Sequence, residues 1–141
     1  MPVHASDAHK GMPMTPEAAE NIDLSQLRAE VQRQMDSYVY KVPAGAIGSS
    51  WSADAIADGI SEMRGALVDP YWITAEIRDT LEQIKMKIPL KRRCAAVADD
   101  GKGMVLLFDP GENSFVLAQR VGAGLSTIGV RGDAVGCFLA R

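Results

Sequence analysis

The amino-acid sequence predicts an α+β protein in which three N-terminal helices pack on a C-terminal antiparallel sheet of about five strands. Between residues 93 and 141, short runs of aliphatic and aromatic residues alternate with turns built from Asp, Gly and Pro. Between residues 23 and 88, apolar residues instead recur at intervals of three and four, which is the spacing of one helix face. The sheet is expected to be a meander, or a small barrel if its first and last strands meet.

Five strands are expected in the last third of the chain, joined by tight turns. They cover residues 93–98, 103–108, 114–121, 126–130 and 134–140. The first turn contains an Asp100-Gly101 step, which is a strong signal for a hairpin. The second contains Pro110 followed by Gly111, a typical turn pair. Because connections this short leave no room for crossover helices, neighbouring strands should be antiparallel.

Several of these strands are apolar on both sides. Residues 104–108, 115–118 and most of 134–140 are continuous apolar runs, whereas a strand with one wet face alternates apolar and polar residues. Both faces of the sheet are therefore expected to be shielded from water. Helices can cover one face. The other face requires barrel closure, a partner chain or a ligand, and the sequence favours barrel closure and a partner chain equally.

The first helix is predicted over residues 23–40 and the second over 52–68. Asp23 and Ser52 stand at their starts, where each side chain can accept a hydrogen bond from the first turn. The apolar stripes are Leu24, Leu27, Val31, Met35 and Tyr38 in the first helix, and Ile56, Ile60, Met63 and Leu67 in the second. For the first helix, packing on the sheet is favoured over a helix seam between two chains.

A third helix is predicted after Asp69, which can act as its cap, with Pro70 in its first turn and Pro89 at its end. Its apolar stripe consists of Ile73, Ile77, Leu81, Ile84 and Ile88. Acidic residues come early in this segment and lysines come late, which suits the dipole of a helix.

The length of 141 residues is sufficient for one domain with a substantial core. We expect this domain at residues 23–141, with helices in 23–88 and the sheet in 93–141, behind a flexible tail at 1–22. The hydrophobic fraction of 47% and the charged fraction of 23% are ordinary for a globular protein. The net charge of -3 argues against a general attraction to nucleic acid.

The cysteine content and the lack of long apolar runs favour a cytoplasmic protein that does not cross a membrane. Cys94 and Cys137 are too few for a disulfide scaffold, and both lie in apolar sequence typical of buried free thiols. The N-terminus has no apolar signal segment, and no apolar run approaches the ~20 residues that a membrane helix needs.

The sequence predicts no catalytic residue, no metal site and no cofactor. Both histidines, His4 and His9, lie in the predicted tail, so the folded body has no histidine to act as a general base or zinc ligand. The predicted turns contain the carboxylates of Asp99, Asp100, Asp109, Glu112 and Asp133. Such carboxylates could act as acid, base or cation ligands, but Asp is also a common turn residue, and the turn interpretation is favoured. The residues thus favour a protein that is not an enzyme.

Three aromatic residues and one arginine form the candidate ligand site. Trp51 precedes the second predicted helix, and Tyr71 and Trp72 begin the third, so the three rings could line the rim of a pocket together with Arg93. Core packing at helix ends is the favoured explanation of these aromatic residues, and the pocket rim and an anchor in an interface are the alternatives.

A basic run connects the third predicted helix to the sheet. It consists of Lys85, Lys87, Lys91, Arg92 and Arg93. These side chains could contact phosphates or an acidic partner. The alternative is a solvated helix end and sheet edge, and nucleic acid is disfavoured because the run has no flanking exposed aromatic residues for base stacking.

Together these features predict a non-enzymatic interaction or binding protein that works as a homodimer. The second face of the sheet or a helix seam would form the interface. The alternative is a small-molecule binding protein, or a small enzyme, with an apolar pocket between helices and sheet that would take a small apolar molecule.

Overall fold

The computed structural model describes residues 22–38 and 52–141, and it confirms an α+β protein with a five-stranded antiparallel sheet. The helices are α3 (Leu24–Asp36), α4 (Ala53–Ala66), α5 (Leu81–Lys85) and α6 (Ala134–Leu139). The strands are β1 (Leu67–Glu76), β2 (Lys91–Asp99), β3 (Met104–Asp109), β4 (Ser114–Val121) and β5 (Gly124–Gly132). The predicted tail, apart from residue 22, lies outside the described residues, and so does Trp51.

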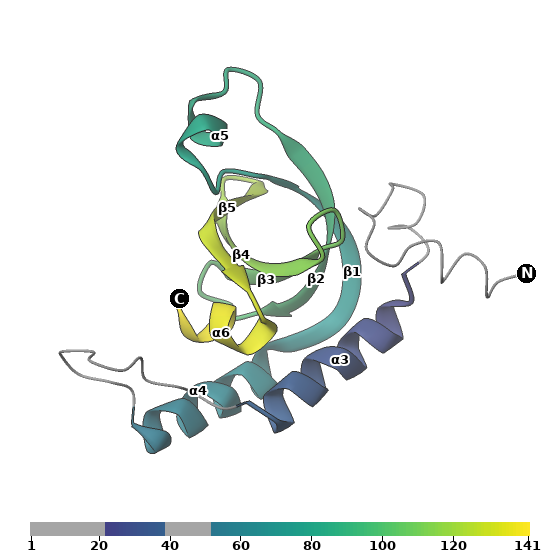
Figure 1. The fold of residues 1–141 in the computed structure, drawn as a ribbon, viewed down its shortest axis with the longest axis vertical. Coiled ribbons are helices and arrows are strands. Elements are labelled where there is room, and N and C mark those ends of the chain that lie inside the picture. Colours follow the sequence, from purple (N-terminus) through teal and green to yellow (C-terminus); the bar gives the residue numbers. More distant parts are fainter. Residues whose placement is uncertain (1–21, 39–51) are drawn as a thin grey trace, which may run out of the picture.

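The strands form a closed barrel in the order β1-β2-β3-β4-β5 (Figure 1). Consecutive strands pair antiparallel, which the short connections predicted for β2 to β5 but not for the pair of β1 and β2. β1 also meets β5 in parallel at Glu76 and Ser126, and this contact closes the barrel. A barrel of five strands in sequence order must close with a parallel pair, because an odd number of alternating directions leaves the first and last strands pointing the same way.

The prediction of a third long helix is wrong. Residues 67–76 form β1, and the helix in this region is limited to the short α5. The error comes from the spacing of Ile73 and Ile77, because a separation of four fits a helix face and also fits the two-residue repeat of a strand. Ala75, which lies between them at the end of β1, is buried, as is Ile77, and burial at alternate positions is the pattern of a strand. Pro70 lies where the β1–β2 register shifts, a position in which a missing N–H is tolerated.

The prediction of a fifth strand at residues 134–140 is also wrong, because this segment is α6. A short apolar run does not distinguish a buried strand from a buried helix. The deciding residue is Asp133, whose carboxylate accepts a hydrogen bond from the backbone N–H of Gly136 at 2.8 Å and so starts a helical turn. The remaining strand is supplied by β1, from within the segment predicted as helix.

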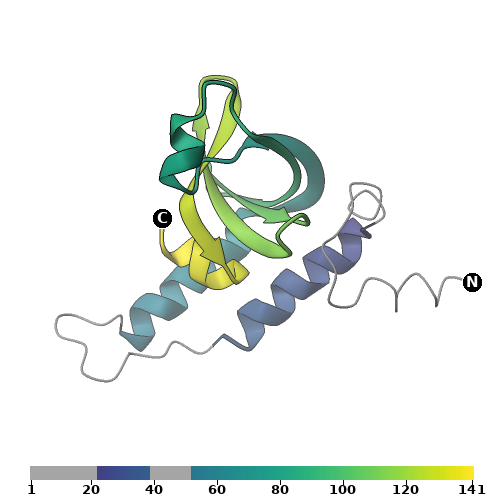
Figure 2. The same ribbon diagram turned by 45° about the horizontal axis from the view of Figure 1, so that its top comes forward.

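The first two helices are confirmed with slightly shorter bounds. Asp23 caps α3 by accepting from the Ser25 N–H at 2.9 Å, and Ser52 caps α4 by accepting from the Ala55 N–H at 3.0 Å. The helices are not all N-terminal, however, and α3 and α4 are the two long helices of the described residues. The predicted arrangement of three N-terminal helices on a sheet is therefore replaced by α3, α4 and the C-terminal α6 around one side of the barrel (Figures 1 and 2).

The apolar side chains of the barrel divide into two clusters, one on each face of the sheet. The inner cluster contains Ala75, Cys94, Ala96, Val105, Leu107, Val116, Ala118 and Leu125. The outer cluster joins Ala95, Val97, Leu106 and Phe115 of the strands to residues of α3, α4 and α6, among them Val31, Met63 and Phe138. Both faces are buried, as the uninterrupted apolar runs predicted, and barrel closure and the helices provide the cover.

Candidate functional site

A buried carboxylate organises the polar residues at the end of the barrel where β2 begins and β3 ends. The Asp109 side chain is 0% exposed. One of its oxygens, Oδ2, accepts hydrogen bonds from Arg92 Nη1 at 2.5 Å and from Arg131 Nη1 at 2.9 Å. The other oxygen, Oδ1, accepts from the backbone N–H of Gly111 at 3.0 Å. Asp109 is a buried charge with complete hydrogen bonding, the condition under which such a charge is tolerated.

Arg131 extends this network to a second carboxylate. Its Nη2 and Nε donate to Asp79 Oδ2 at 2.5 and 3.2 Å, and its Nη1 also donates to Ser114 Oγ at 3.0 Å. Burial alone would raise the pKa of Asp79, but the bonds from Arg131 outweigh it and hold that pKa below its usual value. Burial likewise opposes the charge of Arg131, yet its two carboxylate partners raise the pKa of the guanidinium. Both groups are therefore ionised at neutral pH.

These polar groups also close the barrel where the β1–β5 ladder is short. Asp79 Oδ1 accepts from the backbone N–H of Gly129 at 3.0 Å, and Thr127 Oγ1 accepts from the backbone N–H of Arg78 at 2.7 Å. The segment that comes after β1 is thus tied to β5 by side chains. Side-chain bonds here replace the ladder bonds that continued strand pairing would supply.

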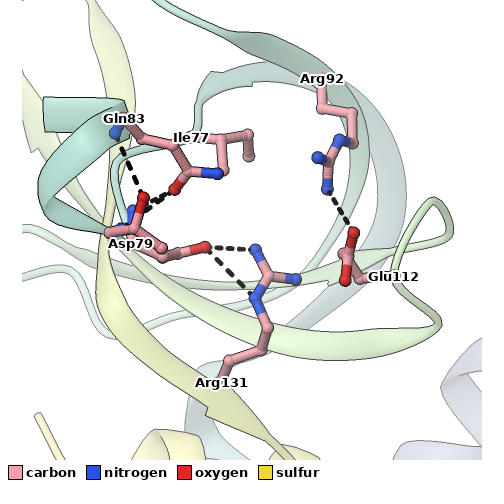
Figure 3. A pocket seen from close by; sticks show the side chains of 7 residues that line it. Ile77, Asp79, Gln83, Arg92, Glu112 and Arg131 are labelled. Atoms are coloured by element: carbon pink, nitrogen blue, oxygen red, sulfur yellow. Dashed lines mark hydrogen bonds and ion pairs between the residues drawn. The ribbon is translucent and has the colours of Figure 1, made fainter. Parts of the chain in front are cut away.

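A cavity of about 280 Å³ lies against this network (Figure 3). It is lined by Ile77, Asp79, Thr80, Gln83, Arg92, Glu112 and Arg131. Glu112 Oε2 lies 3.8 Å from Arg92 Nη1, beyond hydrogen-bond distance, and more than half of the Glu112 side chain is exposed. The cavity combines opposite charges with one apolar wall at Ile77, and its volume is close to the lower end of the range for small-molecule sites.

The structure places three of the four residues of the predicted aromatic site on the paired strands β1 and β2. Tyr71 and Trp72 lie on β1 and not at a helix start, and they occupy successive positions opposite Ala96 and Ala95 of β2. The Arg93 guanidinium lies over the Trp72 ring, 5.4 Å from its centroid, which is a cation–π contact. Trp72 also packs against the outer apolar cluster. Trp72 and Arg93 are therefore neighbours, as expected for a shared site, but neither lines the cavity of Figure 3.

The basic run is divided between two environments. Lys85 ends α5, Lys87 lies in the loop after it, and Lys91 and Arg93 are on β2, all four exposed. Arg92 differs because its guanidinium is bound to Asp109 and lines the cavity. Four of the cations are consequently exposed to solvent, while the fifth, Arg92, belongs to the polar network around Asp109.

Residues 81–91, here called the α5 lobe, expose aliphatic side chains to solvent. Leu81 is 64% exposed, Ile88 is 82% exposed, and Ile84 and Met86 are each nearly half exposed. In both views the lobe projects from the barrel on the side away from α3 and α4 (Figures 1 and 2). Four large exposed aliphatic residues within eight positions form the kind of patch that marks a contact surface in a folded protein.

A second hollow of about 330 Å³ lies between α3 and the barrel. Its apolar lining is Leu27 of α3 with Phe108 and Phe115, whose rings meet edge to face at a centroid distance of 5.1 Å. Glu30, Gln34, Asn113, Ser114, Gly132 and Asp133 complete the lining. This hollow has the location predicted for an apolar pocket, between a helix and the sheet, but its residues are not those of the predicted aromatic site.

For several residues of the polar network, the surrounding sequence does not indicate a functional site. The residues around Asp109, Glu112 and Arg131 indicate turns, and a turn carboxylate or arginine is ordinarily solvated. The helix predicted after Asp69 would place Asp79 on its outer face, and that helix does not form. One signal is present in the sequence: Asp109 comes directly after the fully apolar run 104–108, which is an unusual place for a solvated carboxylate.

The buried thiols are not reactive groups in the folded protein. Cys94 lies in the inner cluster and Cys137 in the outer cluster, and both are free. Burial raises the pKa of each thiol to about 12, so neither forms a thiolate at neutral pH.

Among residues 22–38 and 52–141, no group of three or more His, Cys, Asp or Glu side chains is placed to hold a metal ion. No helix in the same ranges is long and apolar enough to span a bilayer.

Comparisons of the chain with models of protein families, with curated proteins and with solved structures find no match. A functional assignment for this chain therefore rests on its own geometry, above all on the α5 lobe and the polar cavity.

Proposed function

We propose that this protein is a non-enzymatic interaction protein that works as a homodimer, and that the two copies meet through the α5 lobe. The observation that carries this proposal is the exposure of Leu81, Ile84, Met86 and Ile88. Much of the apolar surface of the barrel is covered from within this chain, by barrel closure and by α3, α4 and α6. Among the described residues, four of the seven large hydrophobic side chains that are exposed lie in the lobe.

The energetics favour covering this patch. Moving a fully exposed Ile or Leu side chain out of water stabilises a complex by about 1.5–3 kcal/mol. Several such side chains on one small projection can offset part of the entropic cost of association. A two-fold arrangement uses the same patch on both copies, so that one apolar surface is sufficient for a closed dimer.

The charges on α5 are compatible with an antiparallel contact between two copies. Glu82 and Lys85 lie three residues apart on the helix, beside Leu81 and Ile84. If two α5 helices meet antiparallel, Glu82 of one copy approaches Lys85 of the partner subunit. Opposite charges at the rim of an apolar contact favour the correct register over alternatives.

The proposal includes a cytoplasmic location, which the two free cysteines support.

Sedimentation equilibrium of the full chain tests the proposal. The wild-type protein should be a dimer at tens of micromolar, and Ile88→Asp should weaken the association by at least about tenfold, because it places a charge in the apolar contact. Val121→Asp is the matched control. Val121 is also exposed, at the end of β4 and outside the lobe, so this variant should associate like the wild type. A wild-type monomer at these concentrations would rule out the homodimer.

A small-molecule binding protein is the second candidate, and the hollow beside α3 supports it. Leu27, Phe108 and Phe115 give it an apolar lining suited to a small apolar molecule. The folded wild-type protein should bind an apolar dye, and narrowing the hollow with Leu27→Phe should abolish that binding. A wild-type protein that binds no dye would remove this candidate.

A further inference from the structure

We infer that the polar cavity beside α5 is a binding site for the carboxylate group of a small organic acid, held between Arg92 and Gln83. This inference is independent of the proposed homodimer, because the cavity is built from side chains other than the exposed aliphatic residues of the lobe. It rests on which hydrogen-bond donors face the cavity, and on how firmly each of them is oriented.

Arg92 presents an unused pair of donors. Its Nη1 donates to the buried Asp109, which fixes the guanidinium plane. Its stem passes close to Gly111, where an added Cβ would lie 3.1 Å from Arg92 Cδ, so the absence of a side chain there leaves room for the arginine. Within the described residues, Arg92 Nη2 has no hydrogen-bond partner, so its N–H groups are available to a ligand. A guanidinium oriented in this way is well suited to a carboxylate, because its planar fork matches the two carboxylate oxygens.

Gln83 presents donors from the other wall of the cavity. Its Oε1 accepts from the backbone N–H groups of Asp79 and Thr80, at 2.9 and 3.0 Å. These bonds belong to the capping box of α5, and they determine which end of the amide carries the NH₂ group. The Nε2 group of Gln83 has no partner among the residues that the structure describes. Figure 3 shows Gln83 and Arg92 extending into the cavity from different elements.

Arg92 and Arg131 are already balanced by Asp109 and Asp79, so a ligand carboxylate near Arg92 would take the place of Glu112. Arg131 uses four of its five N–H groups on Asp79, Asp109 and Ser114, so it offers a ligand fewer donors than Arg92 does. Glu112 is the carboxylate nearest to Arg92 on the open side of the cavity, but at 3.8 Å it forms no hydrogen bond, and it stands on an exposed turn from which it can move. A ligand carboxylate that bonds directly to Arg92 Nη2 would therefore compete with Glu112. The wall formed by Ile77 suits a short aliphatic chain, and the volume of about 280 Å³ limits the ligand to a small acid.

An NMR titration of the ¹⁵N-labelled full chain with sodium propionate tests this site. Propionate carries a carboxylate and a short aliphatic chain, and propionamide is its neutral counterpart of the same shape. The side-chain amide signals of Gln83 and the backbone signals of Gly111 and Glu112 should shift and saturate with propionate in the millimolar range. They should not shift in a saturable way with propionamide.

Three variants separate a built site from weak general attraction. Glu112→Gln removes the competing charge from an exposed turn and should tighten propionate binding about two- to fivefold. Arg92→Lys keeps a cation near Asp109 but removes the planar fork, and it should weaken binding at least about tenfold. Asp58→Asn is the control for the change in net charge, because Asp58 is exposed on α4 and does not line the cavity, and it should leave the affinity unchanged.

Each outcome either supports or overturns the site. Saturable shifts with propionate, combined with tightening in Glu112→Gln and not in Asp58→Asn, would support it. Equal shifts with propionamide, or equal tightening in Glu112→Gln and Asp58→Asn, would overturn it, since either result indicates contact without recognition of a carboxylate at Arg92. If the wild-type protein is a monomer but these shifts are still observed, the carboxylate site is supported and the homodimer is not.

Discussion

At the scale of single residues, Asp109 is the position on which the polar network depends. It is buried, and it pairs with two arginines that come from different strands. Removing one partner of a buried ion pair costs more than forming the pair contributes, because the remaining charge is left in a poorly solvating environment. Here Arg131 would keep its bonds to Asp79, whereas Arg92 would lose the carboxylate to which it is hydrogen-bonded.

We expect Asp109→Asn to lower the free energy of unfolding by about 3 kcal/mol, measured by urea denaturation, because Asn keeps the volume but removes the charge. Asp69→Asn is the control. Asp69 pairs with Arg28 at the surface with its side chain almost fully exposed, so its loss should cost less than about 1 kcal/mol. If Asp109→Asn and Asp69→Asn lowered the free energy of unfolding equally, burial would not explain the contribution of Asp109 to stability.

Asp79 predicts a dependence of stability on pH. Its pKa is lower in the folded protein than in the unfolded chain, where an aspartate has a pKa of about 3.9. The unfolded chain therefore binds this proton more tightly, and the stability that Asp79 contributes is present above about pH 5 and is lost as the pH falls below about 4. The difference in unfolding free energy between wild type and Asp79→Asn should shrink over that range. A difference that stays constant down to about pH 3 would contradict the assignment.

At the scale of elements, α6 shows how one cap determines whether an apolar segment becomes a helix. The Asp133 carboxylate occupies the space beside Gly136, where a Cβ would lie only 2.7 Å from Asp133 Oδ1. Gly136 is therefore required so that the cap can approach the first turn, although Gly is a poor residue inside a helix. The two residues act as one unit.

The two substitutions Asp133→Ala and Gly136→Ala should consequently be non-additive. Asp133→Ala should destabilise the protein by about 1–2 kcal/mol through loss of the cap. Gly136→Ala should be destabilising in the wild type, because the new methyl group displaces the carboxylate. In the Asp133→Ala background it should be neutral or stabilising, because the cap is already absent and Ala favours helix. A double-mutant cycle by urea denaturation measures this coupling, and additive effects would contradict it.

At the scale of the whole molecule, the barrel and its helical layer share the same sheet. The inner and outer apolar clusters lie on opposite faces of β2, β3 and β4, so neither can be lost while the other keeps its packing. The barrel and the helices should therefore unfold as one cooperative unit.

The two cysteines report on this cooperativity, because Cys94 is in the inner cluster and Cys137 is in the outer one. Both thiols should resist alkylation by iodoacetamide at about pH 8 in the native protein, since burial raises each pKa to about 12. With increasing urea, they should become reactive along the same curve, measured separately in Cys94→Ala and Cys137→Ala. Earlier labelling of Cys137 would indicate that the helical layer opens before the barrel.

The sequence by itself determined the features that depend on local chemistry. The caps at Asp23 and Ser52 locate α3 and α4, and the turns after Asp99 and Asp109 locate the antiparallel hairpins. The uninterrupted apolar runs also showed that both faces of the sheet are buried, because alternation along a strand depends directly on which side contacts water.

Only the tertiary structure decided what the short apolar segments become and which charges meet. Residues 67–76 and 134–139 each fit a strand or a helix by spacing alone, and the outcome depends on barrel closure and on the space left beside it. Asp79, Arg92, Asp109 and Arg131 are brought together by the register of the strands, across separations of up to 52 residues. Local spacing carries no information on such distant pairings, because they depend on the way the whole sheet closes.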